Sequence, residues 1–146
     1  MVSLMSDAVS AAPCGIHRTY LAADGTGKAR GQAKLMLGGG GVIRLAPDED
    51  VTVGLGVTEG IENALAIMSR GWSPVWAAGS AGAISTFPVL TGIECLTIFA
   101  DADENGAGIK AARACGTRWA AAGRQVDVHY PPAGTDWNDV TLRSAA

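Results

Sequence analysis

The sequence predicts an α/β fold, in which a mostly parallel four-stranded sheet is flanked by helices and preceded by a small β-rich appendage. Two observations lead to this prediction. From Val51 onward, short apolar runs alternate with segments of helical periodicity, which is the order of a parallel sheet with helical crossovers. Before that point, short strand-like runs are separated by glycine-rich turns, which indicates antiparallel pairing.

The apolar runs are expected to form the parallel strands. They span residues 51–57, 73–79, 96–100 and 125–130. Helices are expected between them, over residues 61–68, 83–90 and 106–122. Because these strands are separated by helices, right-handed crossovers should bring the loops at their carboxyl ends to one edge of the sheet.

The first fifty residues divide into two parts. Residues 1–14 are interpreted as a disordered tail, because their apolar positions are too interrupted for a signal peptide or a membrane span. Residues 15–50 are expected to form the β-rich appendage, with strand-like runs at 16–21, 34–37 and 42–45. The main α/β domain is placed at residues 51–143.

Composition limits the classes of function. An apolar content of 48% with 17% charged residues argues against disorder, and a formal charge of −3 gives no global attraction to nucleic acid. Any such binding must use a local patch or a bridging metal ion. The three cysteines do not form a C-x-x-C pair, so neither a disulfide framework nor a structural zinc site is indicated, and the reducing cytoplasm is the expected location.

Acidic side chains follow three of the predicted strands. Glu59 lies beyond the first, Asp101 and Asp103 beyond the third, and Asp136 and Asp139 beyond the fourth. Converging carboxylates repel one another unless a cation neutralises them, and a hard divalent ion such as Mg²⁺ prefers oxygen ligands. The alternative to metal binding is a local role for each residue. Asp103 or Asn105 would cap the third helix, and Glu59 would lie near the positive end of a helix dipole.

Three segments resemble the Toprim domain, the catalytic module of bacterial replicative primases, of type IA and type II topoisomerases and of several nucleases. They are VTEGIENALA (57–66), FADADENGAG (99–108) and PPAGTDWNDV (131–140). The turn AAGSAGA (77–83) and the Asp-Trp-Asn-Asp ending resemble primase-type members, as in phage and plasmid primases and primase-helicases. Residues 15–47 also resemble the segment that precedes Toprim in those proteins. The resemblance implies a Toprim-like, Rossmann-like sheet over residues 51–143.

The resemblance also implies roles for individual residues. Glu59 would be a general acid/base or a metal ligand, and Asp101 and Asp103 would be ligands of Mg²⁺ or Mn²⁺. Asp136, with Asn138 or Asp139, would extend the site toward a second metal or the nucleotide phosphates. Gly60 and Gly106 match the glycines of the signature. The sequence departs from replicative primases at Asn63, because they usually carry an Asp four residues after the Glu.

The activity implied is Mg²⁺-dependent nucleotidyl transfer: synthesis of RNA primers on a single-stranded DNA template from nucleoside triphosphates. The chain would be one module of a phage- or plasmid-type primase in a bacterial or phage-infected cell. Its expected partners are a helicase and a zinc-binding domain in trans, and it is not expected to bind a membrane. Two alternatives stay open, a Toprim nuclease that uses water in place of the 3′-hydroxyl and a non-catalytic module that binds template or helicase. A haloacid-dehalogenase-like phosphatase is disfavoured, because its D-x-D motif follows the first strand.

Basic residues are the candidate phosphate contacts, against the alternative of ordinary solvated charges. They are Lys28, Lys34 and Arg44, with Arg30, in the appendage and Lys110 and Arg113 on the third helix. The stretch from Lys28 to Lys34 is favoured, because basic residues in a glycine-rich β segment can follow a single strand's backbone. Trp137 is expected to pack under the metal loop.

Overall fold

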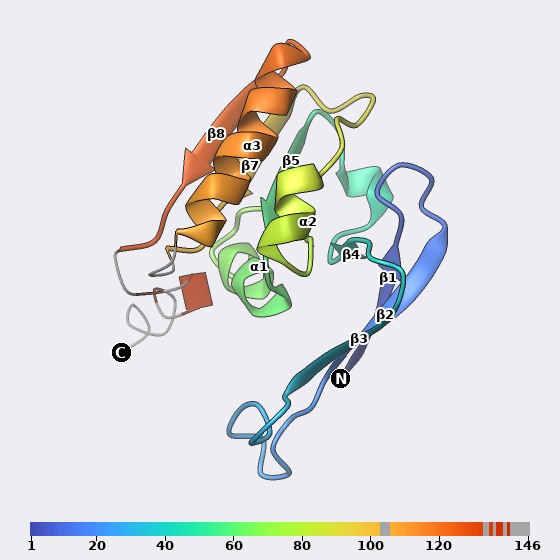
Figure 1. The fold of residues 1–146 in the computed structure, drawn as a ribbon, viewed down its shortest axis with the longest axis vertical. Coiled ribbons are helices and arrows are strands. Elements are labelled where there is room, and N and C mark those ends of the chain that lie inside the picture. The colour runs from blue at the N-terminus through green and yellow to red at the C-terminus, as the bar shows by residue number, and fades with distance from the viewer. Residues whose placement is uncertain (103–105, 133–134, 136, 139, 141–146) are drawn as a thin grey trace.

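The computed structural model of the chain describes residues 1–102, 106–132, 135, 137, 138 and 140. Within these residues, five strands form the main sheet in the order β4-β6-β5-β7-β8 (Figure 1). The strands are β4 (Ile43–Arg44), β5 (Gly54–Thr58), β6 (Val75–Ala77), β7 (Cys95–Phe99) and β8 (Gln125–His129). All neighbouring pairs are parallel except β4–β6, so the prediction of a mostly parallel sheet is confirmed.

Helices connect the parallel strands where the periodicity predicts them. They are α1 (Ile61–Met68), α2 (Ala81–Thr86) and α3 (Ala107–Ala121). Gly71 and Gly123 follow α1 and α3 with φ of +85° and +76°, the left-handed conformation that glycine adopts at helix C-termini. The predicted helix at 83–90 begins two residues earlier, because the Ser80 hydroxyl caps it by accepting a hydrogen bond from the Ala83 N–H at 3.1 Å.

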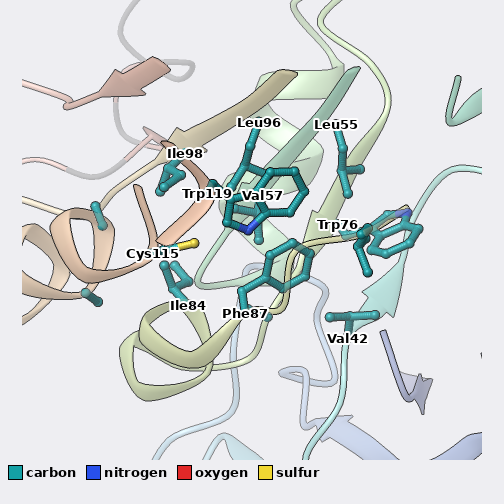
Figure 2. Packing of buried hydrophobic residues seen from close by; sticks show 14 of the residues in the cluster. Val42, Leu55, Val57, Trp76, Ile84, Phe87, Leu96, Ile98, Cys115 and Trp119 are labelled. Carbon is teal, nitrogen blue, oxygen red and sulfur yellow. The ribbon is translucent and has the colours of Figure 1, made fainter. Parts of the chain in front are cut away.

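One face of the main sheet packs against α2 and α3. Leu55, Val57, Leu96 and Ile98 alternate along β5 and β7 toward Trp119 of α3, and all five are fully buried (Figure 2). The ring of Trp119 stacks on that of Phe87 at the end of α2, with centroids 6.0 Å apart. This cluster forms the larger core of the molecule.

The opposite face of the sheet packs against α1 and the N-terminal strands. Val75, Ala77 and Phe99 point to this side, where Ile61 of α1 and Met5 cover them. Side chains therefore alternate between two cores along the central strands, which is why these strands are apolar at nearly every position. The two cores fix β5 and β7 from both sides.

The N-terminal strands form a separate antiparallel sheet in the order β1-β2-β3. They are β1 (Val2–Ser6), β2 (Pro13–Thr19) and β3 (Lys34–Gly38). The prediction that residues 1–14 are a disordered tail is therefore wrong over β1 and the start of β2. Val2 pairs with Arg18 and Leu4 with Ile16, and Met5 is 1% exposed. A short alternating segment gives little sign of strand structure until its non-local partner is known.

Strand β4 differs from its predicted place. The sequence puts it in the appendage, whereas the structure pairs Ile43 with Ala77, so that β4 is the antiparallel edge of the main sheet. A short 3₁₀ turn (Asp48–Asp50) then leads from β4 toward β5. The appendage and the α/β domain consequently share a sheet. Among the described residues, we find no helix whose length and apolar content would let it span a lipid bilayer.

We predict that Leu96→Ala destabilises the fold by about 2–5 kcal/mol, because the side chain is fully buried between β5 and α3 and the substitution leaves a cavity. Leu65→Ala is the control, because Leu65 is 49% exposed on α1 and its replacement should cost less than about 0.5 kcal/mol. Urea denaturation of both variants measures the difference. Equal midpoints would contradict the core described here.

Candidate active site at the carboxyl ends of β5 and β7

The connections out of β5 and β7 run in opposite directions. The chain leaves β5 through α1 to β6 on one side, and leaves β7 through α3 to β8 on the other. Helices α1 and α3 lie on opposite faces of the sheet. Such a switch point leaves a crevice at the carboxyl ends of the two strands, and this is where open α/β sheets bind their ligands.

The described carboxylates of the predicted site lie in this crevice. Thr58, the last residue of β5, pairs with Phe99, the last residue of β7, so Glu59 and Asp101 follow neighbouring strands at the same edge. Both residues line a pocket of about 140 Å³ together with Asn63 and Asn138. The backbone of Glu59 is held in place by the Gly79 N–H, which donates to the Glu59 carbonyl at 2.8 Å. Residues 59 and 101 are therefore brought together as predicted.

Asn63 connects three parts of the site. It lies in the first turn of α1, is 5% exposed, and donates from Nδ2 to Asp101 Oδ1 at 2.8 Å. Its Oδ1 accepts from the backbone N–H of Asn138 at 3.3 Å. The reverse orientation would face oxygen to carboxylate and N–H to N–H, so the network admits one orientation only. An Asp here would place two carboxylates in contact, whereas Asn63 supplies a donor.

Trp137 supports the same loop. Its Nε1 donates to the carbonyl of Ala100 at 3.1 Å, and its ring meets Phe99 edge-on with centroids 5.4 Å apart. Trp137 thus packs against the start of the loop after β7, and metal binding by that loop stays a prediction. This contact, with that of Asn138, brings the segment after β8 back to the pocket.

Two glycines shape the start of α3. Gly106 precedes the helix with φ of +67°, a left-handed conformation that suits glycine. A Cβ at Gly108 would overlap the carbonyl oxygen of Asp101. Sequence reasoning did not select Gly108, although the G-x-G spacing after the acidic motif is a signal that could have identified this close approach. Its missing side chain lets the helix approach the backbone of Asp101.

Two lysines of the N-terminal region line the pocket as well. Lys28 Nζ lies 2.9 Å from Glu62 Oε1, and Lys34 Nζ lies 3.2 Å from Glu62 Oε2. Burial opposes the charge on Glu62, but the hydrogen bond from Lys28, its own backbone N–H and Lys34 together lower its pKa to about 2. Glu62 is thus ionised at neutral pH. Sequence reasoning did not select Glu62, because an acid in the first turn of a helix is common.

The other predicted cations lie elsewhere. Arg44 lines a different cavity, where its guanidinium stacks on Trp76 at 4.1 Å and pairs with Asp48 at 2.7 Å. It also donates to Ser6 and to the carbonyls of Asp7 and Ala8, so its contacts are those of a structural residue. Lys110 and Arg113 are exposed on α3, and Arg30 is exposed in the loop before β3. None of these four lines the pocket.

The remaining predicted ligands, Asp103, Asp136 and Asp139, lie outside the described residues. Within the described part of the chain, no group of three or more His, Cys, Asp or Glu side chains is placed to hold a metal ion. The donors present are the carboxylates of Glu59 and Asp101 and the amides of Asn63 and Asn138. These are hard oxygen donors and fit Mg²⁺ or Mn²⁺, which are commonly held by one or two carboxylates.

Comparison with known families identifies the fold around this pocket. The model of the Toprim domain family matches residues 54–146, which begin at β5 and include Glu59, Asn63 and Asp101. The chain belongs to the Toprim domain family. The prediction of a Toprim-like fold is therefore confirmed, and DNA primase domains are among the solved structures with a similar fold. Comparison with curated protein sequences gives no match.

Solved structures similar to this Toprim chain include three primase structures. A DNA primase domain from Pseudomonas aeruginosa has a TM-score of 0.59 at 16% identity, with 96% of this chain and 52% of that one covered. The Aquifex aeolicus primase, with zinc-binding and RNA polymerase domains, has a TM-score of 0.66 at 18% identity, covering 97% and 36%. The DnaG catalytic core has a TM-score of 0.64 at 20% identity, covering 95% and 47%.

The likeness in fold extends beyond the Toprim domain. Because 95–97% of the chain is covered, the matched region includes most of the N-terminal sheet, which precedes the family match at residue 54. The chain spans about a third to a half of the length of these primase structures.

We predict that Gly108→Ala displaces the Asp101 backbone and destabilises the Toprim domain by about 1–3 kcal/mol, the usual cost of overpacking. Gly116→Ala is the matched control on the same helix, where the new Cβ would lie 3.4 Å from Val126 Cγ1. There the gain of about 0.5–1 kcal/mol in helix propensity should offset the tight contact. Thermal unfolding of both variants measures the difference, and an equal loss of stability at the two positions would contradict the prediction.

We predict that Asn63→Ala weakens Mn²⁺ binding by about 10–100-fold, because Asp101 loses the donor that orients it. Isothermal titration of the chain with Mn²⁺ measures the affinity. Ser69→Ala is the control, because its hydroxyl caps α1 by donating to Ala66 O at 2.7 Å, away from the pocket. Unchanged Mn²⁺ affinity in Asn63→Ala would show that the hydrogen bond has no part in metal binding.

Proposed function

We propose that this chain is the Toprim part of a primase-type nucleotidyltransferase, which makes RNA primers on single-stranded DNA from nucleoside triphosphates with Mg²⁺ or Mn²⁺. One observation carries the proposal. Two acidic residues, Glu59 and Asp101, and two basic residues, Lys28 and Lys34, line a single pocket at the switch point of the sheet. Phosphoryl transfer uses acidic groups that bind a divalent cation and basic groups that bind the phosphates.

The acidic and the basic residues of the pocket would have different roles. Glu59 and Asp101 would hold the divalent ion, with Asp103, Asp136 and Asp139 as the further proposed ligands. When bound, such an ion neutralises the charge that develops on the transferred phosphorus and its oxygens. Lys28 and Lys34 would contact the phosphates of the incoming nucleotide, and Asn63 keeps Asp101 oriented through its 2.8 Å hydrogen bond. The rigid sheet edge positions all of these groups.

The origin of the lysines favours a primase over a Toprim nuclease. Lys28 precedes β3 and Lys34 is its first residue, so both precede the Toprim family match and come from the N-terminal region. Primase structures share the fold of nearly the whole chain, including that sheet. A pocket completed by this sheet supports a function that uses the N-terminal region and the Toprim domain together.

Other parts of a primase would act with this chain. The chain covers 36–52% of the primase structures it resembles, and one of them includes a zinc-binding domain. We propose a zinc-binding domain and a helicase as its partners in trans, and single-stranded DNA as the template.

The test is primer synthesis on a single-stranded template with labelled nucleoside triphosphates, in Mg²⁺ and in chelator. Glu59→Gln and Asp101→Asn should each lower synthesis by at least about a hundred-fold and leave the circular dichroism spectrum unchanged. Glu49→Gln is the control, because Glu49 is an exposed acid in the turn before β5.

Two outcomes would overturn the proposal. One is full Mg²⁺-dependent synthesis by the Glu59 or Asp101 variant. The other is shortening of a labelled template strand with no new strand made, which would indicate a nuclease.

A further inference from the structure

Glu62 joins the N-terminal region to the Toprim domain at the edge of the pocket. It lies in the first turn of α1, and its two oxygens contact Lys28 and Lys34 at 2.9 and 3.2 Å. These lysines precede it by 34 and 28 residues: Lys34 is the first residue of β3, and Lys28 lies in the segment before that strand. The Lys28–Glu62–Lys34 cluster is therefore a link between two parts of the fold as well as a part of the pocket wall.

Strand alternation explains why Lys34 reaches this position. In β3, Lys34 pairs with Thr19 and Met36 with His17, and Thr19 and His17 are buried at the face toward the Toprim domain. Leu35 and Leu37 point to the opposite face, as the alternation of a strand requires. The register of β2 with β3 thus directs Lys34 toward α1. Gly60 lies beneath the cluster, where a Cβ would be 3.4 Å from Glu62 Oε2 and 3.9 Å from Lys34 Nζ.

The charges of the cluster sum to one positive charge. Glu62 is ionised at neutral pH, because its pKa is about 2, and each lysine contributes one positive charge. His17 is close enough to sense all three groups, but burial and then Lys34 lower its pKa below the ordinary value of 6.5, so it adds no charge. The cluster is the basic part of a pocket whose other charged groups are Glu59 and Asp101.

A lysine held by one carboxylate oxygen keeps its capacity for phosphate, because an ammonium group has three N–H donors. Both lysine side chains are more than 40% exposed, and an exposed lysine side chain samples many rotamers unless contacts such as those with Glu62 restrict it. Immobilising such a side chain costs affinity when a ligand has to order it, and a contact that orders it beforehand removes that cost.

We infer that Glu62 is a positioning residue, which holds Lys28 and Lys34 at the pocket so that they bind the polyphosphate of a nucleoside triphosphate. This inference rests on the proposed function of the pocket. Glu62 would not touch the nucleotide itself. It has an opposing effect as well, because its negative charge repels phosphate. Since each of its oxygens is paired with an ammonium group, this repulsion is largely cancelled. The ordering of the two lysines then makes the net effect of Glu62 on phosphate affinity favourable.

The experiment is isothermal titration of the 146-residue chain with ATP and with AMP, in Mg²⁺ and in chelator. Glu62→Ala should weaken ATP binding by about ten-fold and affect AMP far less, because AMP lacks the polyphosphate. Glu62→Gln should give an intermediate loss, because its amide oxygen still accepts from one lysine. Glu94→Gln is the matched control, because Glu94 pairs with Arg124 at 2.5 Å at the opposite end of β7 and should bind ATP as the wild type does.

A thermodynamic cycle separates positioning from a general structural effect. In a chain that carries Lys28→Ala and Lys34→Ala, adding Glu62→Ala should cause no further loss of ATP affinity. Equal or tighter ATP binding by Glu62→Ala would overturn the inference and show that repulsion dominates, and so would a wild-type chain that binds no ATP. Primer synthesis is not the readout. Glu62-dependent ATP binding, together with shortening of a labelled template and no new strand, would therefore refute the proposed function and leave this inference standing.

Discussion

The parallel pairing of β5 with β7 is the constraint on which the site depends. Their register places Thr58 beside Phe99, and the two chains then diverge toward opposite faces of the sheet. Both strands are held by a core on each face, so neither can slide without moving buried side chains such as Leu96 and Phe99 from one core to the other. Glu59 and Asp101 therefore come to the same edge of the sheet because the strands that precede them are fixed by buried side chains.

Loops that converge on a rigid sheet still need local contacts to define side-chain positions. Here those contacts come from distant segments: Asn63 bonds Asp101 and the backbone of Asn138, and Trp137 bonds the carbonyl of Ala100. Each replaces water around a polar group with a fixed partner, which restricts the directions in which the Asp101 carboxylate can point. A small domain can in this way orient a catalytic carboxylate without a large number of packed layers around it.

Much of the α/β domain could be predicted from the sequence, and the reason is that its signals are local. Apolar runs identify β5 to β8, Gly71 and Gly123 end helices, and the three motifs bring Glu59 and Asp101 to one edge. The failures involve non-local pairing. Strand β1 is recognisable only through its pairing with β2, and the place of β4 in the main sheet only through its pairing with β6. Glu62 was not selected for the same reason, since its contacts are with Lys28 and Lys34, which precede it by 34 and 28 residues.

The distribution of charge shows how an acidic chain can present a site for a polyanion. A net charge of −3 gives no long-range attraction, so binding must come from groups within a few ångströms of the phosphates. Under the proposed function, the pocket would meet this need from two directions, with acidic residues at the sheet edge for a cation and lysines from the N-terminal region for the anion. The neutral side chain of Asn63 also affects the charge of the pocket. A neutral amide there orients Asp101 without adding to the negative charge that the cation and the lysines must offset.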